Sequence, residues 1–375
     1  MLKEKIIVFL LLFALGSSLQ ASAQSVKKRV PDSVMERIYE QVKTPYKYGL
    51  VLVPADNAHK VDCPTVFRKS GKWYMTYIVY NGRGYETWLA GSSDLLHWNT
   101  LGRILSFSDT ADWDNNQKAG YVSLEDDRWG GSYQLQRYRH QYWMSYFGGH
   151  SRGYEKGLLS IGIAFTKRSP AKPHEWKRLD HPVLRIKDKD VSWWDNHALY
   201  KSTVIWDKKK TTGYPFVMYY NANGDSVHKR GAERIGMAIS KDMVHWKRFG
   251  KNPVLDHQQG ITGDPDIQKI GRVWVMFYFG AFWKHTGGAF NRFACSYDLV
   301  HWTDWKGPNL IEPSKPYDEA FAHKSSVINY QGTVYHFYCA VDKSFQRGIA
   351  VATSRDMGTS VLHFVKPKQK KNKKR

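Results

Sequence analysis

The sequence predicts an all-β protein folded as a five-bladed β-propeller, and two internal repeats carry this prediction. A turn of the form Ser-x-Asp-x-x-His-Trp occurs three times, and each copy follows an apolar strand, a short turn and an aromatic-rich strand. Five copies of this meander succeed one another at a period of roughly 50 to 75 residues. Four short strands per repeat are typical of a propeller blade, whereas solenoid repeats are shorter and contain helices.

The N-terminal segment, residues 1–23, is expected to be a signal peptide. Lys3 and Lys5 precede an unbroken apolar run over residues 6–15, and Ala21 and Ala23 offer small side chains at a cleavage site. The run is too short to span a membrane. We therefore expect export to the periplasm or the medium. Residues 24–49 then form a lead-in, helical only over Asp32 to Val42.

The repeated turn has a structural explanation. Ser and Asp side chains in such turns accept hydrogen bonds from nearby backbone N–H groups, and the Trp covers the turn. The full copies cover residues 92–98, 240–246 and 296–302, and weaker copies lie at 173–176 and 354–357. The paired strands preceding them are expected within 65–77, 132–146, 202–220, 266–278 and 325–338. The propeller domain accordingly spans residues 50–365.

The composition of the chain limits the classes of molecule that it is expected to bind. The net charge is +22, with 56 Lys and Arg against 34 Asp and Glu, and seven positive charges fall in a tail over residues 366–375 that we expect to be disordered. For an exported protein this favours an anionic polysaccharide or cell surface over nucleic acid, although basicity that only maintains solubility explains it equally well. The three Cys do not form a disulfide framework and are expected to be buried thiols.

The first strand of each propeller blade lines the central axis, so residues at its start should converge at one end of the channel. These are Asp62 in blade 1, Gly130 and Gly131 in blade 2, residues 196–201 in blade 3, Asp264 and Asp266 in blade 4, and Glu319, His323 and Lys324 in blade 5. Glu86 and Glu125 are outside candidates. Trp129, His197 and Trp283 are candidate platforms for a sugar, and Lys324 a candidate substrate contact.

The converging carboxylates are not required by the repeat. Crowded like charges cost free energy unless one group is protonated or paired. Glycoside hydrolysis uses such an arrangement: one carboxylate activates water or attacks, and a second, with a raised pKa, protonates the leaving oxygen. Asp62, Asp264, His323 and Glu319 are the candidate catalytic residues, and either His323 or Glu319 could be the acid.

The chain resembles the five-bladed propeller glycoside hydrolases around families 43, 32 and 117. The resemblance rests on the five repeats, the Asp62-Cys63-Pro64-Thr65 segment, the Lys72-Trp73-Tyr74 strand and the Ser-x-Asp-x-x-His-Trp turns. Blades 2 and 3 lack the acids usual in family 43. Asp62, Asp264 and His323 follow the order typical of family 117, although Glu319 lies four residues before His323 rather than beside it.

This resemblance implies an exo-acting, inverting glycosidase, with Asp62 as the base, Asp264 orienting the sugar, and His323 or Glu319 as the acid. The substrate would be an oligo- or polysaccharide, anionic if the basic charge is a guide. No cofactor is expected, and a structural Ca²⁺ on the axis is compatible with the fold although no ligand spacing indicates one. The alternatives are a glycan-binding propeller without catalysis, and a phosphorylase that uses Lys201, His323 and Lys324 to bind phosphate.

Overall fold

The computed structural model describes residues 29–110, 112–224, 232–284 and 286–365. The predicted signal peptide and basic tail lie outside these residues. Within them the fold is all-β, as predicted, with a single α-helix, α2 (Asp32–Val42), over the residues expected to be helical. No described helix is both long enough and apolar enough to cross a membrane.

The strands form antiparallel meanders of four. One sheet holds β2–β5 and a second holds β6–β9. Their bounds are β2 Lys60–Lys69, β3 Lys72–Tyr80, β4 Tyr85–Ser92, β5 Asn99–Leu105, β6 Gln117–Ser123, β7 Tyr142–Gly149, β8 Leu159–Thr166 and β9 Lys177–Arg178.

The remaining strands form one large mixed sheet of twelve strands. Its first part is β10 Ala198–Trp206, β11 Phe216–Asn223, β12 Glu233–Ser240, β13 Trp246–Arg248, β14 Ile261–Ile270, β15 Val273–Ala281, β16 Ala289–Ser296 and β17 Thr303–Asp304. The short 3-10 helix η1 (Pro316–Asp318) follows, and the sheet continues with β18 Phe321–Tyr330, β19 Thr333–Val341, β20 Arg347–Thr353 and β1 Tyr46–Leu52. Single parallel pairs, Glu233 with Ile261 and Ala289 with Phe321, link its antiparallel groups.

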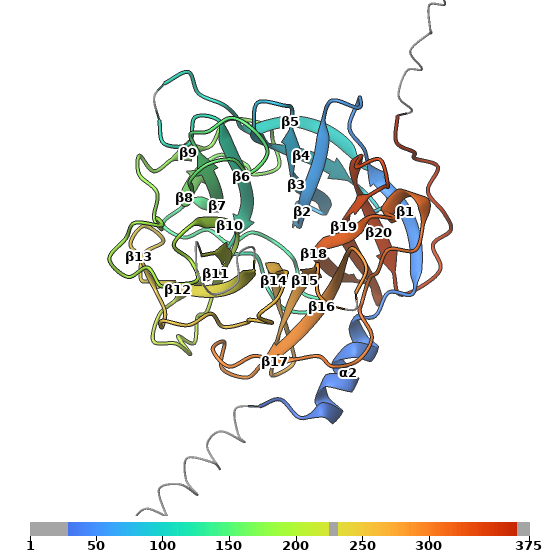
Figure 1. The fold of residues 1–375 in the computed structure, drawn as a ribbon. Helices are drawn as coiled ribbons and strands as arrows, with labels where there is room; N and C mark the ends of the chain where they lie inside the picture. The colour runs from blue at the N-terminus through green and yellow to red at the C-terminus, as the bar shows by residue number, and fades with distance from the viewer. Residues whose placement is uncertain (1–28, 111, 225–231, 285, 366–375) are drawn as a thin grey trace, which may run out of the picture.

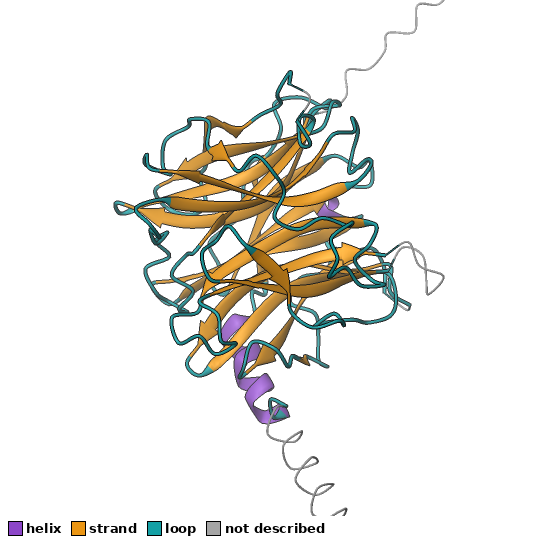
Figure 2. Cartoon of the chain, turned by 90° about the vertical axis from the view of Figure 1, so that its left-hand side faces the viewer, coloured by secondary structure: helices purple, strands orange, loops and turns teal. Residues whose placement is uncertain are grey.

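The meanders surround a common centre, and their first strands face it (Figure 1). Strands β6, β10, β14, β18 and β2 contact one another in that order, except that β6 meets the β2 sheet through β3 and β4. Strand β1 pairs antiparallel with β20, so the N-terminal part of the chain completes the last meander. Figure 2 shows α2 at the edge of the strand assembly, where buried Met35, Ile38 and Val42 join a core cluster with β14–β16 and β18–β20.

The three full turn repeats fold alike. In the first, Ser92 Oγ accepts from the backbone N–H of Leu95 at 2.9 Å, Asp94 Oδ1 accepts from the N–H of His97 at 2.8 Å, and Trp98 Nε1 donates to the Leu95 carbonyl at 3.0 Å. All three bonds recur around Asp242, and the two backbone bonds recur around Asp298. The repeat therefore satisfies backbone groups, as predicted.

One prediction about the repeat is wrong. The sequence placed the first strand of the second meander near Ser132, with Gly130 and Gly131 at its entrance, but the structure has β6 at Gln117–Ser123, entirely buried. Residues 124–141 instead run between β6 and β7. The alternation of apolar side chains there arises because Tyr133 and Leu135 are buried in a segment with only isolated bridges, such as Arg68 with Gln134.

Candidate active site

A pocket opens at the end of the centre where the first strands begin. It is lined by residues from all five meanders; those with charged or hydroxyl side chains are Asp62, Tyr85, Tyr121, Tyr154, Glu155, Tyr200, Lys201, Glu233, Asp264, Lys324 and Arg347. Most of these residues come from the first half of a first strand or from the connection between the second and third strands, because antiparallel pairing brings these two places to the same edge. Tyr121 lies further along β6.

The pocket segments of three first strands share an irregular backbone. Register shifts follow Asp62, Gly263 and His323, which occupy equivalent positions in β2, β14 and β18. The next residue in each strand has a left-handed φ: 50° at Cys63, 53° at Asp264 and 64° at Lys324. Such conformations are uncommon outside glycine and gather at functional sites. Each bulge turns the following side chain toward the axis, and Asp264 is thus equivalent to Cys63, not Asp62.

Asp62 forms the most heavily hydrogen-bonded group of the pocket. Its Oδ2 accepts from Arg347 Nη1 at 2.7 Å, Lys324 Nζ at 3.0 Å and the Tyr154 hydroxyl at 3.4 Å. Burial raises the pKa of Asp62, but the charges of Lys324 and Arg347 outweigh burial and hold it well below the usual value. Asp62 is therefore an ionised anchor for two cations.

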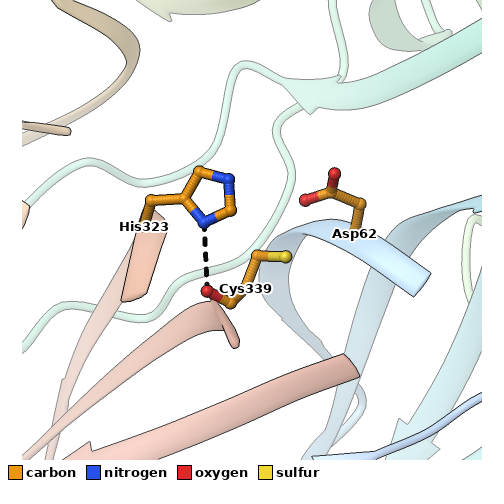
Figure 3. A group of neighbouring side chains, drawn as sticks. All are labelled: Asp62, His323 and Cys339. Atoms are coloured by element: carbon orange, nitrogen blue, oxygen red, sulfur yellow. Dashed lines mark hydrogen bonds between the residues drawn. The ribbon is translucent and has the colours of Figure 1, made fainter. Parts of the chain in front are cut away.

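His323 lies beside this anchor. Its Nδ1 donates to the Cys339 carbonyl at 3.2 Å (Figure 3). Burial and then the charge of Lys324 lower the pKa of His323 to about 3, so the ring is neutral near pH 7. An acid role for this residue would need a raised pKa, which is the opposite shift.

Asp62, His323 and Cys339 bring one oxygen, one nitrogen and one sulfur within 4.8 Å of one another (Figure 3). This donor set resembles that of a metal site. However, two cations already occupy Asp62, and burial raises the pKa of the Cys339 thiol well above its usual value. The surroundings therefore fit a hydrogen-bonded cluster better than a bound cation. All three Cys are buried and free, as predicted.

Two pocket carboxylates were not predicted from the sequence. Glu155 lies between β7 and β8 with φ 49°, and its Oε1 accepts from the Tyr85 hydroxyl at 3.4 Å. Buried Gln117 fixes this connection by donating to the carbonyls of Ser151 and Lys156, both at 2.9 Å. Burial raises the pKa of Glu155, although Lys324 and Arg347 oppose the shift.

Glu233 begins β12, and its Oε2 accepts from Asn221 Nδ2 at 2.6 Å. Burial, then the charges of Glu155 and Asp264, raise the pKa of Glu233 to about 8. This carboxyl group is therefore protonated at neutral pH. Asp264 also has a raised pKa, caused by burial and opposed by Lys324 and Lys201. Both glutamates lie at or beside the connection between the second and third strands, whereas the predicted catalytic candidates lie at or just before the starts of first strands.

The other candidates lie outside the pocket. Glu319 is exposed, with Lys343 Nζ 3.8 Å from its carboxylate, and lines a separate hollow. Trp129 stacks on Phe277 with ring centroids 6.3 Å apart, and Trp283 is buried, donating to the Ile261 carbonyl. His197 is exposed at the start of β10.

The three remaining acids lie elsewhere too. Asp266 and Glu125 line a second, deeper cavity on the axis, whereas Glu86 is buried and paired with Arg103 at 3.0 Å. The structure thus brings Asp62, Asp264, His323 and Lys324 together and adds Glu155, Glu233 and Arg347.

An axial pocket with a protonated carboxyl beside further carboxylates is the arrangement that glycosidases use. No protein-family model and no curated protein matches the chain. A solved complex of the protein BT0996 with RGII is 57% identical, covering 90% of this chain and 99% of that one, with a TM-score of 0.88. A second solved structure, of a glycoside hydrolase, is 56% identical with the same coverage and TM-score.

The chain therefore belongs to the glycoside hydrolases and is a glycosidase. A family 117 glycoside hydrolase from the marine bacterium Zobellia galactanivorans is 14% identical, covers 86% of this chain and 96% of its own, and has a TM-score of 0.62. That likeness shows the fold alone, and it agrees with a propeller.

Proposed function

We propose that the chain removes a terminal sugar from an RGII oligosaccharide, with Glu233 as the general acid. The observation that carries this proposal is the pKa of about 8 at Glu233, because an acid catalyst must hold its proton at working pH. The substrate class is supported by the 57% identical protein, whose solved structure is a complex with RGII.

Glu155 is the partner carboxylate. It lines the same pocket as Glu233, and its charge contributes to the raised pKa of Glu233. Burial raises the pKa of Glu155, but the charges of Lys324 and Arg347 limit the rise. These two cations thereby favour an ionised form able to attack or to activate water. Asp62, assigned as the base from the sequence, positions these two cations instead.

Exo-action is supported by the shape of the site, since a pocket closed by rings at the end of an axis accepts a chain terminus. Aromatic side chains from all five meanders line it: Tyr85, Tyr121, Phe147, Tyr154, Tyr200, Phe279, Phe282 and Phe321. Lys201, Lys324 and Arg347 favour an anionic sugar. Inversion, expected from the family 117 resemblance, stays a prediction that the anomer of the first product, observed by NMR, will test.

The proposal also includes the number of blades, which is five, and the export of the protein from the cytoplasm. Each of the five first strands opens a four-stranded group, and only single pairs join the groups of the large sheet, which supports five blades. A crystal structure with continuous ladders across these joins would contradict it. Export to the periplasm or medium also stays a prediction, tested by the N-terminal sequence of the mature protein.

The experiment that tests the function measures sugar release from RGII oligosaccharides and from a panel of neutral, uronate-containing and sulfated oligosaccharides. The wild type should release one monosaccharide from an RGII oligosaccharide, and Glu155→Gln and Glu233→Gln should not. Glu319→Gln is the matched control and should retain wild-type rates, because this glutamate is exposed outside the pocket. Equal activity of all four proteins would overturn the assignment.

A further inference from the structure

Two phenylalanines at the mouth of the pocket are unusually exposed. Phe282, between β15 and β16, has 62% of its surface exposed, and Phe345, between β19 and β20, has 56%. Both lie at the edge from which Arg347 and Phe321 reach the pocket. Large apolar side chains exposed beside a cavity mark contact surfaces for a ligand.

Both residues also have a strained backbone. The φ angle is 57° at Phe282 and 59° at Phe345, a region that bulky residues rarely adopt and that glycine would occupy without cost. The turn carrying Phe345 is held by Asp342, whose Oδ1 accepts from the N–H groups of Ser344 at 2.9 Å and Gln346 at 2.8 Å. The strain persists with the ring held outward, so packing within the protein does not explain it.

The rings of Phe282 and Phe345 both contact the ring of Phe321. Phe321 contacts Phe282 edge-to-face with ring centroids 5.8 Å apart, and Phe345 at 6.2 Å. Phe321 in turn lies 5.7 Å from the ring of His323 inside the pocket. A continuous aromatic surface therefore runs from the interior of the pocket to the solvent. We call Phe282, Phe321 and Phe345 the aromatic ledge.

We propose that the aromatic ledge binds the sugar on the leaving-group side of the scissile bond by stacking against the C–H face of its ring. This inference rests on the proposed function, since the terminal sugar fills the pocket and the next residue of the glycan must lie at the mouth. Flat, rigid rings bind a sugar ring at low entropic cost. The ledge thus selects oligosaccharides over the free terminal sugar.

The test compares Phe282→Ala and Phe345→Ala with the wild type on the RGII oligosaccharide, measuring KM, kcat and inhibition by the monosaccharide that the wild type releases. Each variant should raise KM about 10-fold, which corresponds to about 1.4 kcal/mol, with kcat nearly unchanged because the contact is equal in ground and transition states. Inhibition by the monosaccharide should not change in Phe345→Ala, since that sugar occupies only the pocket and Phe345, unlike Phe282, is not among the residues that line it.

Tyr297→Ala is the matched control. Tyr297 is 39% exposed and follows β16 at the end opposite Ala289, which lines the pocket, so KM should stay at the wild-type value. Phe345→Gly separates function from stability: relief of the left-handed strain should keep the melting temperature at or above that of the wild type while KM still rises.

Unchanged KM in both alanine variants would overturn the ledge while leaving the proposed function intact. Equal loss of affinity for the oligosaccharide and the monosaccharide in Phe345→Ala would also overturn it, because the damage would then lie in the pocket. A wild type that hydrolyses no oligosaccharide would overturn both proposals.

Discussion

Acidic side chains of the outer turns and of the axial pocket meet opposite surroundings. Asp94 is exposed and Asp242 is half-buried. Partial desolvation acts to raise the pKa of each, but hydrogen bonds from His97 or His245 and from backbone N–H groups lower it to about 2. Glu233 accepts a side-chain hydrogen bond from Asn221 and lies near other carboxylates, and burial and their charges raise its pKa to about 8. Both regions lie on the same repeated framework.

The difference shows how a repeat separates stability from chemistry. In the turns, each carboxylate completes the hydrogen bonds of a backbone that needs it, so its charge stabilises the fold. In the pocket, burial without enough donors destabilises the charged form and keeps a proton available. We therefore expect the non-repeated acids to be the reactive ones.

The largest expected effect comes from replacing Glu233, the proton donor that we propose for the pocket. Glu233→Gln should reduce kcat on the RGII oligosaccharide by about 10³-fold, within the range for loss of a general acid, with the fold retained because the amide keeps the volume of the acid. The measurement is steady-state hydrolysis, repeated on an aryl glycoside of the released sugar. A loss that is equally large for the aryl leaving group, which needs little protonation, would contradict the acid role.

The substitution Asp62→Asn extends the comparison into the pocket, because Asp62, like the aspartates of the turns, is ionised and held by hydrogen bonds. Loss of this charge leaves Lys324 and Arg347 buried without their partner, which should lower the free energy of unfolding by about 3–5 kcal/mol. Urea denaturation of both proteins at pH 7 measures this difference in the free energy of unfolding.

The stability that the charge of Asp62 contributes should depend on pH in one direction. The pKa of Asp62 is lowered in the folded protein, so its contribution is present above the unfolded pKa of about 3.9 and is lost as pH falls through the folded value. The stability difference between wild type and Asp62→Asn should therefore shrink in acid. A variant as stable as the wild type at pH 7 would contradict the anchoring role.

The smallest effect is expected in the turns. Asp242→Ala removes bonds to the backbone N–H groups of Val244 and His245 and should cost about 1 kcal/mol, as loss of a comparable cap does. Denaturant unfolding and kcat/KM, measured on the same preparation, check both parts of this prediction. Because the turn contributes no residue to the pocket, kcat/KM should not change. A substantial change would contradict the proposal that the turns stabilise the fold while the pocket carries the chemistry.

Much of the framework could be predicted from the sequence because it repeats. The turns at Asp94, Asp242 and Asp298 recur as local patterns, and local hydrogen bonds fix them regardless of distant packing. Strand β6 was missed because its sequence, Gln117–Ser123, has polar residues that are buried by tertiary contacts. A local pattern does not reveal burial of this kind.

The site was predicted only in part. Asp62, Asp264, His323 and Lys324 were found because aligned repeats place strand starts at one end of the axis. Glu155 and Glu233 were missed, although antiparallel geometry puts each connection between second and third strands at that same end. Their raised pKa depends on burial by several meanders, which no single segment of sequence encodes.

The most direct test of the central claim is the dependence of kcat/KM on pH for the wild type on the RGII oligosaccharide. The pKa of Glu233 is about 8 and catalysis requires its protonated form, so kcat/KM should fall as pH rises through about 8. A kcat/KM that stays constant from pH 7 to well above 9, or that falls with an apparent pKa near 4.3, the usual value for Glu, would contradict the claim that the axial pocket holds a protonated carboxyl as its acid.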